Sequence, residues 1–242
     1  MKKPLIISAL SFTLLFSSCE TLNQAGQIIT QTAGTPTSTE ITQGLKQALE
    51  IGTTNSSERL SLADGFLKNA AVKILFPDEA QKVEKTLRSI GMNKLCDDVI
   101  TSLNRAAEDA ASEAKPIFIA AIKQMTIADA SNILLGKQDD AATQYFKRVT
   151  SDQLRAKFNP IIASSLNKVG ATKYWTSAIT NYNKIPLVSK INPDLDDYVT
   201  EKAIDGLFYE IAQEELKIRG NIYARTNSLL QKVFGYADRN KG

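Results

Sequence analysis

The chain has 242 residues, 43% of them hydrophobic, so it is long enough to bury a substantial core in one large domain or two small ones. It carries 29 basic and 26 acidic side chains, which give a formal net charge of +3. Histidine is absent, and this excludes Ser-His and Cys-His nucleophiles, histidine metal sites and acid–base catalysis by histidine.

Residues 1–18 have the pattern of a bacterial lipoprotein signal peptide. Two lysines precede an apolar run from Leu5 to Phe16 that is too short for a transmembrane span, and two serines stand directly before Cys19. This predicts cleavage before Cys19 and lipidation of its sulfur, although Phe16 stands where the commonest motif has leucine. The alternative is a buried cysteine in an ordinary signal peptide. Removal of residues 1–18 lowers the net charge to +1, which argues against a nucleic-acid-binding surface.

We therefore expect an exported protein of the cell envelope, anchored by lipid at Cys19 to a bacterial membrane, either facing the periplasm or at the outer membrane. Residues 19–39 are rich in Thr, Gln, Gly and Ser and contain no Lys or Arg, which predicts a flexible tether. A folded domain is predicted at 40–238. Cys96 is then the one remaining thiol, so no intrachain disulfide forms, and we expect it to be a small buried hydrophobe.

The domain is predicted to be organised around the stretch Leu95–Leu135, where apolar residues recur at helical spacing. Its apolar arc is about 160° wide and half alanine, which predicts a helix packed between several neighbours. A kink or helix junction is expected at Lys115–Pro116. Thr126 and Asp129 have the spacing of a capping box, which predicts a short helix at 127–135 that stops at Gly136.

The rest of the domain is divided by cap and stop residues into further helices, with no convincing strand and no repeat. The fold class is therefore all-α, a single domain of nine or ten helices behind the signal peptide and tether. The other expected helices are Ile41–Gly52, Asn55–Leu67, Pro77–Gly91, Asp139–Phe146, Ser151–Leu166 with a kink at Pro160, Lys173–Tyr182, Pro193–Gly220 and Ile222–Gly235.

Two short motifs have the residue types of a catalytic or metal site. Ser165 and Lys168 fit S-x-x-K, in which lysine activates a serine nucleophile, but no K-T-G or S-D-N motif accompanies them. The acidic run 192–197 is similar to a calcium loop, yet Asp197 stands where the turn needs glycine and Ala203 where a bidentate glutamate is needed. We interpret the run as a helix start, with Asn192 as the cap and acids favoured by the helix dipole.

Asn104, Arg105 and Glu108 lie on the side of the central helix opposite its Ala/Leu face. If they are exposed, Arg105 and Glu108 would form an ordinary ion pair that stabilises the helix by about 0.2–0.5 kcal/mol. Covered by other helices, the three residues would instead form a buried polar network and a binding site. We expect the exposed arrangement, and in either case a structural or binding role. Candidates on the last long helix to face them are Glu201, Lys202 and Asp205.

The aromatic residues Tyr174, Trp175 and Tyr182 are expected to belong to the core, the alternative being the lining of an apolar pocket.

Several strings of the sequence carry a resemblance to a known family. They are GLKQAL (44–49), NRAAE (104–108), MTIADASNILLGKQDDAATQYF (125–146), YVTEKAIDGLF (198–208) and EELKIRGN…LLQKVFG (214–235). Through them the chain resembles an uncharacterised bacterial lipoprotein family, domain of unknown function 4197, over nearly all of residues 41–235. The resemblance implies an all-helical, envelope-exported protein with no assigned activity. One departure is Ile222, where proline is expected after Asn221, and it affects only a helix junction.

The sequence thus predicts a membrane-anchored envelope lipoprotein that is a non-catalytic helical module for binding a protein partner or an apolar ligand. No cofactor, metal or nucleic-acid partner is predicted. The alternative is a histidine-free hydrolase or lyase that uses carboxylates, or Ser165 with Lys168.

Overall fold

The computed structural model describes residues 34–240 apart from 169, 171, 173, 174, 177–179, 181, 182, 184–189 and 193. The predicted all-α class is confirmed: these residues contain no strand and eight α-helices, against the nine or ten expected. The predicted signal peptide, Cys19 and most of the helix expected at 173–182 lie outside the described residues. The elements are α2 (Ser38–Ser61), η1 (Asp78–Ala80), α3 (Gln81–Ser89), α4 (Asn93–Ala111), α5 (Ala114–Gln124), α6 (Ile127–Leu135), α7 (Ala141–Lys168), α9 (Leu195–Gly220), η2 (Ile222–Ala224) and α10 (Ser228–Asn240).

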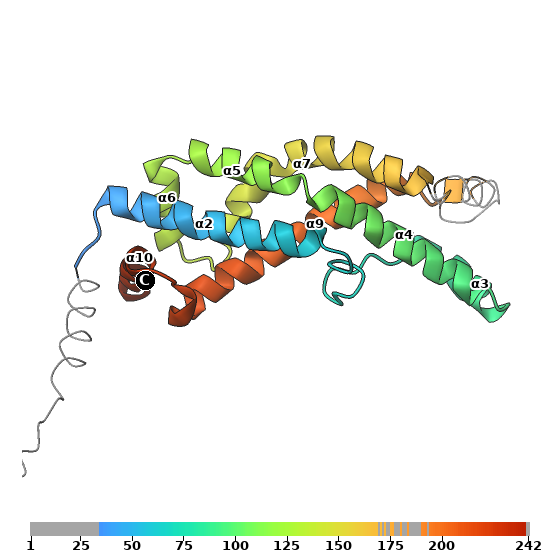
Figure 1. Cartoon of the computed structure of the whole chain (residues 1–242), viewed down its shortest axis with the longest axis horizontal. Coiled ribbons are helices and arrows are strands. Elements are labelled where there is room, and N and C mark those ends of the chain that lie inside the picture. The colour runs from blue at the N-terminus through green and yellow to red at the C-terminus, as the bar shows by residue number, and fades with distance from the viewer. Residues whose placement is uncertain are drawn as a thin grey trace, which may run out of the picture.

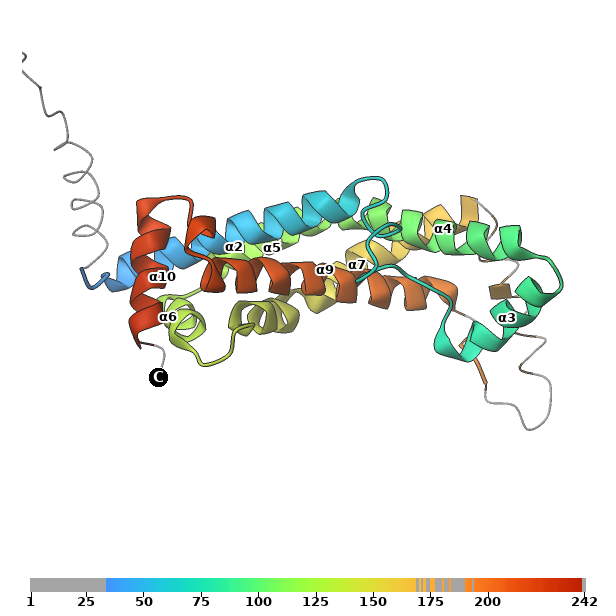
Figure 2. The same cartoon turned by 90° about the horizontal axis from the view of Figure 1, so that it is seen from below.

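The helices form an elongated bundle with α9 packed against α2, α4 and α7 (Figure 1). One end holds the start of α2 together with α6 and α10, and the other end holds α3 and the start of α4 (Figure 2). Between α2 and η1 the chain is not α-helical, and this 62–77 segment runs along the bundle past α4 and α9. The largest fully buried side chains include Phe66, Phe118, Phe146, Phe158 and Phe234.

Helix α2 is longer than predicted. It continues through Gly52, where an end was expected, and through Asn55, which was expected to cap a second helix. A Cβ at Gly52 would stand 3.4 Å from Cβ of Glu214 in α9, and Ser56 and Ser57 are buried. Packing of this stretch against the bundle therefore outweighs the roughly 1 kcal/mol that a mid-helix glycine costs.

Helix α7 is also continuous from Ala141 to Lys168, so the prediction of a separate helix that starts at Ser151 is wrong. The Ser151 hydroxyl does not cap a helix but donates to the Lys147 carbonyl at 2.6 Å, one turn earlier. Pro160 lies inside α7, where a proline costs about 3 kcal/mol or more. Phe158 and Ile162 on either side of it are fully buried, and this packing holds the helix together.

The capping box predicted at the start of α6 is confirmed. The Asp129 N–H donates to Oγ1 of Thr126 at 3.1 Å, and the Asp129 carboxylate accepts from the Thr126 N–H at 3.0 Å. Hydrogen bonds from the Thr126 hydroxyl and backbone lower the pKa of Asp129. The helix ends at Leu135, directly before Gly136, as predicted.

The junction in the central stretch lies three residues before its predicted place. Helix α4 ends at Ala111 and α5 begins at Ala114, so Pro116 falls in the first turn of α5. Backbone N–H groups there have no partner within the helix, and the missing proton of Pro116 therefore costs no hydrogen bond. The central helix is split, as expected, but at Ser112–Glu113.

Helix α9 also has a different cap from the one predicted. Asp194 is the N-cap, and its carboxylate accepts from the Asp197 N–H at 2.9 Å. Asn192 does not cap the helix, because its Oδ1 accepts from the Asp194 N–H at 2.9 Å. After α9, the single closing helix expected at 222–235 is replaced by η2 and α10, and α10 passes through Gly235.

No single helix in the described residues has the length and hydropathy of a membrane span. Helices α5 and α6 pass that test only when taken together, and they are bent by 105° at their break. Both helices contribute buried side chains to the core, among them Phe118 and Leu134.

Helix α2 begins at Ser38, two residues before the predicted start, with a capping box between Thr37 and Glu40. The Glu40 carboxylate also pairs with Lys232 of α10 at 2.7 Å. The Lys232 ammonium and the Thr37 N–H lower the pKa of Glu40 from 4.5 to about 2.

These contacts predict a pH dependence of stability. Because the pKa of Glu40 is lower in the folded chain, its contribution is complete above pH 4.5 and is lost as the pH falls toward 2. The Glu40→Gln variant should therefore show a shallower fall of the melting temperature than the wild type in this range, and Lys232→Met should act in the same direction. Parallel melting curves for wild type and Glu40→Gln would contradict this assignment.

Candidate functional site

The 62–77 segment contains a short extended stretch. Val72, Ile74 and Phe76 are buried, and the residues that alternate with them are exposed, as expected when successive side chains point to opposite sides. This stretch is not part of a sheet, so its buried backbone N–H and C=O groups need other partners.

Asn104 of α4 supplies part of those partners. Its side chain is fully buried, and Oδ1 accepts from the Ile74 N–H at 2.9 Å. The Nδ2 group donates to the carbonyl oxygens of Ile74 at 2.8 Å and of Ile100 at 2.7 Å. Asn104 therefore fixes one edge of the extended stretch to α4.

Glu108 binds the same segment one helical turn further along α4. Its Oε1 accepts from the N–H groups of Phe66 and Leu67, both at 3.1 Å. Its Oε2 pairs with Arg105 at 2.5 Å, and Arg105 also pairs with Asp64 at 2.6 Å. The Glu108 side chain is 4% exposed and that of Arg105 is 42% exposed.

The structure thus brings the three predicted residues together as a polar network, and it corrects the expectation that they face solvent. Asn104 and Glu108 are buried because the 62–77 segment covers them. The expected partners on α9 lie elsewhere: Glu201 pairs with Arg155, while Lys202 and Asp205 line a groove on the solvent side of the segment. The hydrogen-bond partners of the network are mostly backbone groups, so its evident role is to hold the segment in place.

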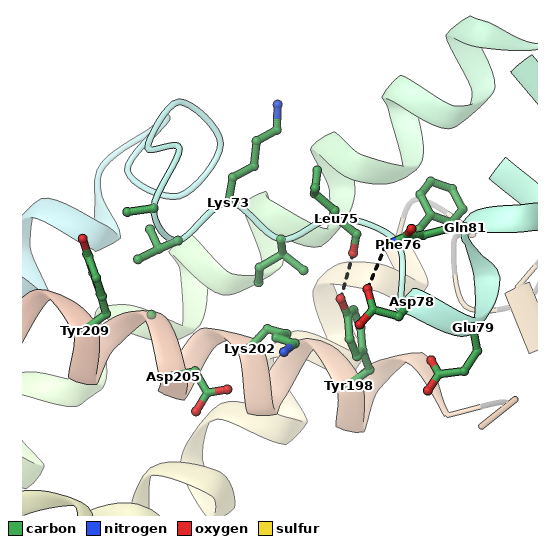
Figure 3. Close-up of a pocket in the computed structure, with 14 residues that line it drawn as sticks. Lys73, Leu75, Phe76, Asp78, Glu79, Gln81, Tyr198, Lys202, Asp205 and Tyr209 are labelled. Atoms are coloured by element: carbon green, nitrogen blue, oxygen red, sulfur yellow. Dashed lines mark hydrogen bonds between the residues drawn. The ribbon is translucent and has the colours of Figure 1, made fainter. Parts of the chain in front are cut away.

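A groove of 630 Å³ lies between residues 71–81 and α9 (Figure 3). Helix α9 contributes Tyr198, Lys202, Asp205 and Tyr209, which follow one another at steps of four, three and four and so lie along one face. The opposite wall carries apolar and charged groups. Its labelled side chains are Lys73, Leu75, Phe76, Asp78, Glu79 and Gln81.

Gly206 sets how closely the two walls approach. A Cβ at this position would stand 2.8 Å from the Phe66 ring and 3.1 Å from Cβ of Val72. Any larger residue would push the 62–77 segment away from α9. Glycine at 206 therefore keeps the floor of the groove closed.

Tyr198 ties the groove walls together. Its hydroxyl donates to the Leu75 carbonyl at 3.0 Å, and Nζ of Lys202 lies 5.9 Å from the centre of its ring. Burial, with smaller effects of the Asp78 and Glu79 carboxylates, raises the pKa of Tyr198 to about 12. The phenol therefore stays protonated at neutral pH and acts as a hydrogen-bond donor, not as a base.

A second hollow of 580 Å³ continues from this groove over α3. The two share Leu75 and Gln81, and the second is also lined by Lys82, Lys85 and Arg88. Leu75 stands between them with half of its surface exposed. Together they form a long, open depression with apolar and charged walls.

The predicted catalytic alternatives do not converge on this groove. The Ser165 hydroxyl donates to the Asp109 carboxylate at 2.7 Å, and Lys168 is exposed at the end of α7. Cys96 is fully buried, as expected, and burial raises the pKa of its thiol. In the described part of the chain, no three His, Cys, Asp or Glu side chains lie close enough to hold a metal ion.

Among the predicted aromatic residues, Tyr174 and Tyr182 lie outside the described residues. Trp175 is buried, and its ring centre lies 6.2 Å from that of Phe76 in a tilted contact. Phe76 also lines the groove, so Trp175 supports that wall from behind.

Sequence reasoning did not identify the groove, although two signals for it were present. The alternation of apolar residues at 72, 74 and 76 indicates an extended stretch with one buried side. The spacing of Tyr198, Lys202, Asp205 and Tyr209 indicates one helical face that carries both aromatic and charged groups. Neither signal shows that the two elements lie side by side.

Comparison with known proteins gives one match. Neither the curated proteins nor the solved structures contain a match to the chain. The model of a family described as "Protein of unknown function (DUF4197)" matches residues 35–235. The match includes the whole groove and every element of the bundle, apart from the last residues of α10. The chain therefore belongs to the DUF4197 family of proteins of unknown function.

Proposed function

We propose that the chain is a lipid-anchored protein of the bacterial cell envelope that binds a partner protein in the groove beside α9 and catalyses no reaction. The anchor is supported by the pattern before Cys19, where an apolar run and two serines precede the cysteine. Binding is supported by the groove, which is the observation that carries the proposal.

The composition of the groove favours a protein partner over a small apolar ligand. Tyr209 and Leu75 are 43% and 50% exposed at its rim, and aromatic residues are enriched where proteins bind each other. Acidic and basic side chains flank these apolar contacts on both walls. Sites for small apolar ligands are instead enclosed and lined mainly by apolar groups.

The partner is expected to bind through side-chain contacts and not as an added β-strand. Added strands need free backbone groups along an exposed edge. Here Asn104 occupies the N–H and C=O of Ile74 on one edge, and Tyr198 occupies the carbonyl of Leu75. The hydrolase alternative gains no support, because Ser165 is bonded to Asp109 and the phenol of Tyr198 remains protonated.

The groove is tested by a photo-crosslinking residue at Tyr209 of the full-length chain in living cells, with Lys157 on α7 as an exposed control outside the groove. We expect Tyr209 to give one discrete protein adduct and Lys157 to give none. The purified partner should then bind Lys202→Glu about tenfold more weakly than wild type, a loss of about 1.4 kcal/mol. Equal crosslinking at both positions, or equal affinity for Lys202→Glu, would overturn binding in the groove.

The anchor is tested separately with Cys19→Ser. Metabolic labelling with a fatty-acid probe should mark the wild type and not the variant, and the variant should leave the membrane fraction. Equal labelling of the two would show that the chain is not a lipoprotein.

A further inference from the structure

The junction between α9 and α10 exposes two neighbouring apolar side chains. In η2, Ile222 is 61% exposed and Tyr223 is 91% exposed. Leu216, in the last turns of α9, is also exposed, at 43%. Ile222 and Tyr223, which are adjacent in the sequence, therefore form a small exposed apolar surface.

This junction is held firmly in place by Arg225, whose side chain is 3% exposed. Its guanidinium donates to the carbonyl oxygens of Ile218 at 3.1 Å and Arg219 at 2.7 Å, so it caps the end of α9. It also pairs with Asp238 of α10 at 2.7 Å. The two exposed side chains are therefore presented by a turn that is fixed to two helices.

The turn lies at the end of the bundle where the chain arrives from its N-terminus. The start of α2, the end of α9 and α10 share this end in both views (Figure 1, Figure 2). From Cys19 to Thr37 the chain advances by 18 residues, and the flexible tether predicted for this stretch would span about 21–25 Å on average. The opposite end is farther away, because α9 alone, with 26 residues, is about 39 Å long.

The chemistry of the turn suits the surface of a lipid bilayer. Tyrosine is enriched at membrane interfaces, where its ring meets acyl chains and its hydroxyl meets water and headgroups. Isoleucine beside it adds apolar area that can be buried at the same depth. A contact this small binds weakly alone, but a covalent anchor makes the binding intramolecular and so raises the effective concentration of bilayer.

We propose that η2 docks on the bilayer that holds the lipid anchor, with Ile222 and Tyr223 at the boundary between headgroups and acyl chains. The inference rests on the proposed anchor at Cys19. Docking at this end leaves the opposite end of the bundle, with α3, farther from the membrane (Figure 2). The groove, which lies toward α3, is then presented to partners away from the bilayer.

The test uses the full-length lipidated protein in vesicles of phosphatidylethanolamine and phosphatidylglycerol that contain a lipid brominated on its acyl chains. Tryptophan replaces Tyr223 in one variant and Ile90 in the control. Ile90 is matched because it is 66% exposed at the opposite end of the bundle. The signal of the one native tryptophan, Trp175, is measured in wild type and subtracted.

Tyr223→Trp is expected to lose about half of its added fluorescence, because interfacial side chains enter roughly 5–10 Å into the headgroup and acyl boundary. Ile90→Trp should lose none. A protein that floats with the vesicles but is quenched no more at 223 than at 90 would overturn docking alone. A wild type that does not float, or a Cys19→Ser variant that floats equally well, would overturn the anchor and the docking with it.

Discussion

Replacement of Glu215 by alanine is expected to lower the free energy of unfolding by about 3–5 kcal/mol, because it leaves the buried Arg219 guanidinium without its carboxylate. The two side chains are 4% and 9% exposed and lie 2.8 Å apart. Glu215 also accepts from the N–H groups of Ala142 and Thr143, both at 2.9 Å, and so caps the start of α7. Urea unfolding followed by circular dichroism measures the loss.

Two further variants show whether burial is the cause. Glu215→Gln keeps the size and one acceptor oxygen, and should cost less than Glu215→Ala. Asp98→Ala removes an exposed pair with Lys94 and should cost less than about 1 kcal/mol. A Glu215→Ala loss no larger than that of Asp98→Ala would contradict the role of this pair.

The same residues show where sequence reasoning about α9 fails. Helical periodicity predicts Leu216 inside, yet Leu216 is 43% exposed while its neighbour Glu215 is buried. The reason is that α9 ends against the junction of α6 and α7. Arg219 donates to the carbonyl oxygens of Ile133 and Leu134 at the end of α6. The Glu215 carboxylate accepts from the Ala142 N–H at the start of α7. Helix ends require polar partners, and no pattern within α9 reveals that another pair of helix ends lies beside it.

Features that depend on residues only a few positions apart were predicted correctly. The Thr126–Asp129 capping box predicted the start of α6. Gly91, which has a φ of 85°, lies two residues after the end of α3 and stops the helix close to the predicted position. Both depend on backbone groups no more than a turn away. The two missed continuities, in α2 at Gly52 and in α7 at Ser151, depend on neighbours far along the chain.

The candidate site was predicted only in part, for the same reason. Asn104, Arg105 and Glu108 were placed together on one side of a helix, which follows from periodicity alone. Their burial depends on the 62–77 segment, and the sequence instead predicted that its first residues belong to a helix at Asn55–Leu67. The groove needs that segment and α9 together, and they are more than a hundred residues apart in the sequence.

The structure changes the expected energetics of Arg105 and Glu108. If both side chains were buried, removal of Arg105 alone would leave the Glu108 carboxylate charged and unpaired. The double variant would then lose less stability than Arg105→Ala. Here Arg105 is 42% exposed, whereas Glu108 is buried and accepts from two backbone N–H groups. Removal of Glu108 should therefore be the more damaging change.

Glu108→Ala is expected to cost about 3 kcal/mol, because hydrogen bonds to a buried charged group contribute about 1.5–3 kcal/mol each and the N–H groups of Phe66 and Leu67 lose their acceptor. Arg105→Ala should cost about 1 kcal/mol, as for partly exposed pairs. The double variant should resemble Glu108→Ala, since the same two N–H groups remain unpaired in both. Glu108→Gln, which keeps an acceptor oxygen, is the matched control and should lie between the two single variants. Urea unfolding of all four distinguishes these outcomes. A double variant more stable than Arg105→Ala would mean that the orphan charge, and not the support of the 62–77 segment, dominates the energetics of Glu108.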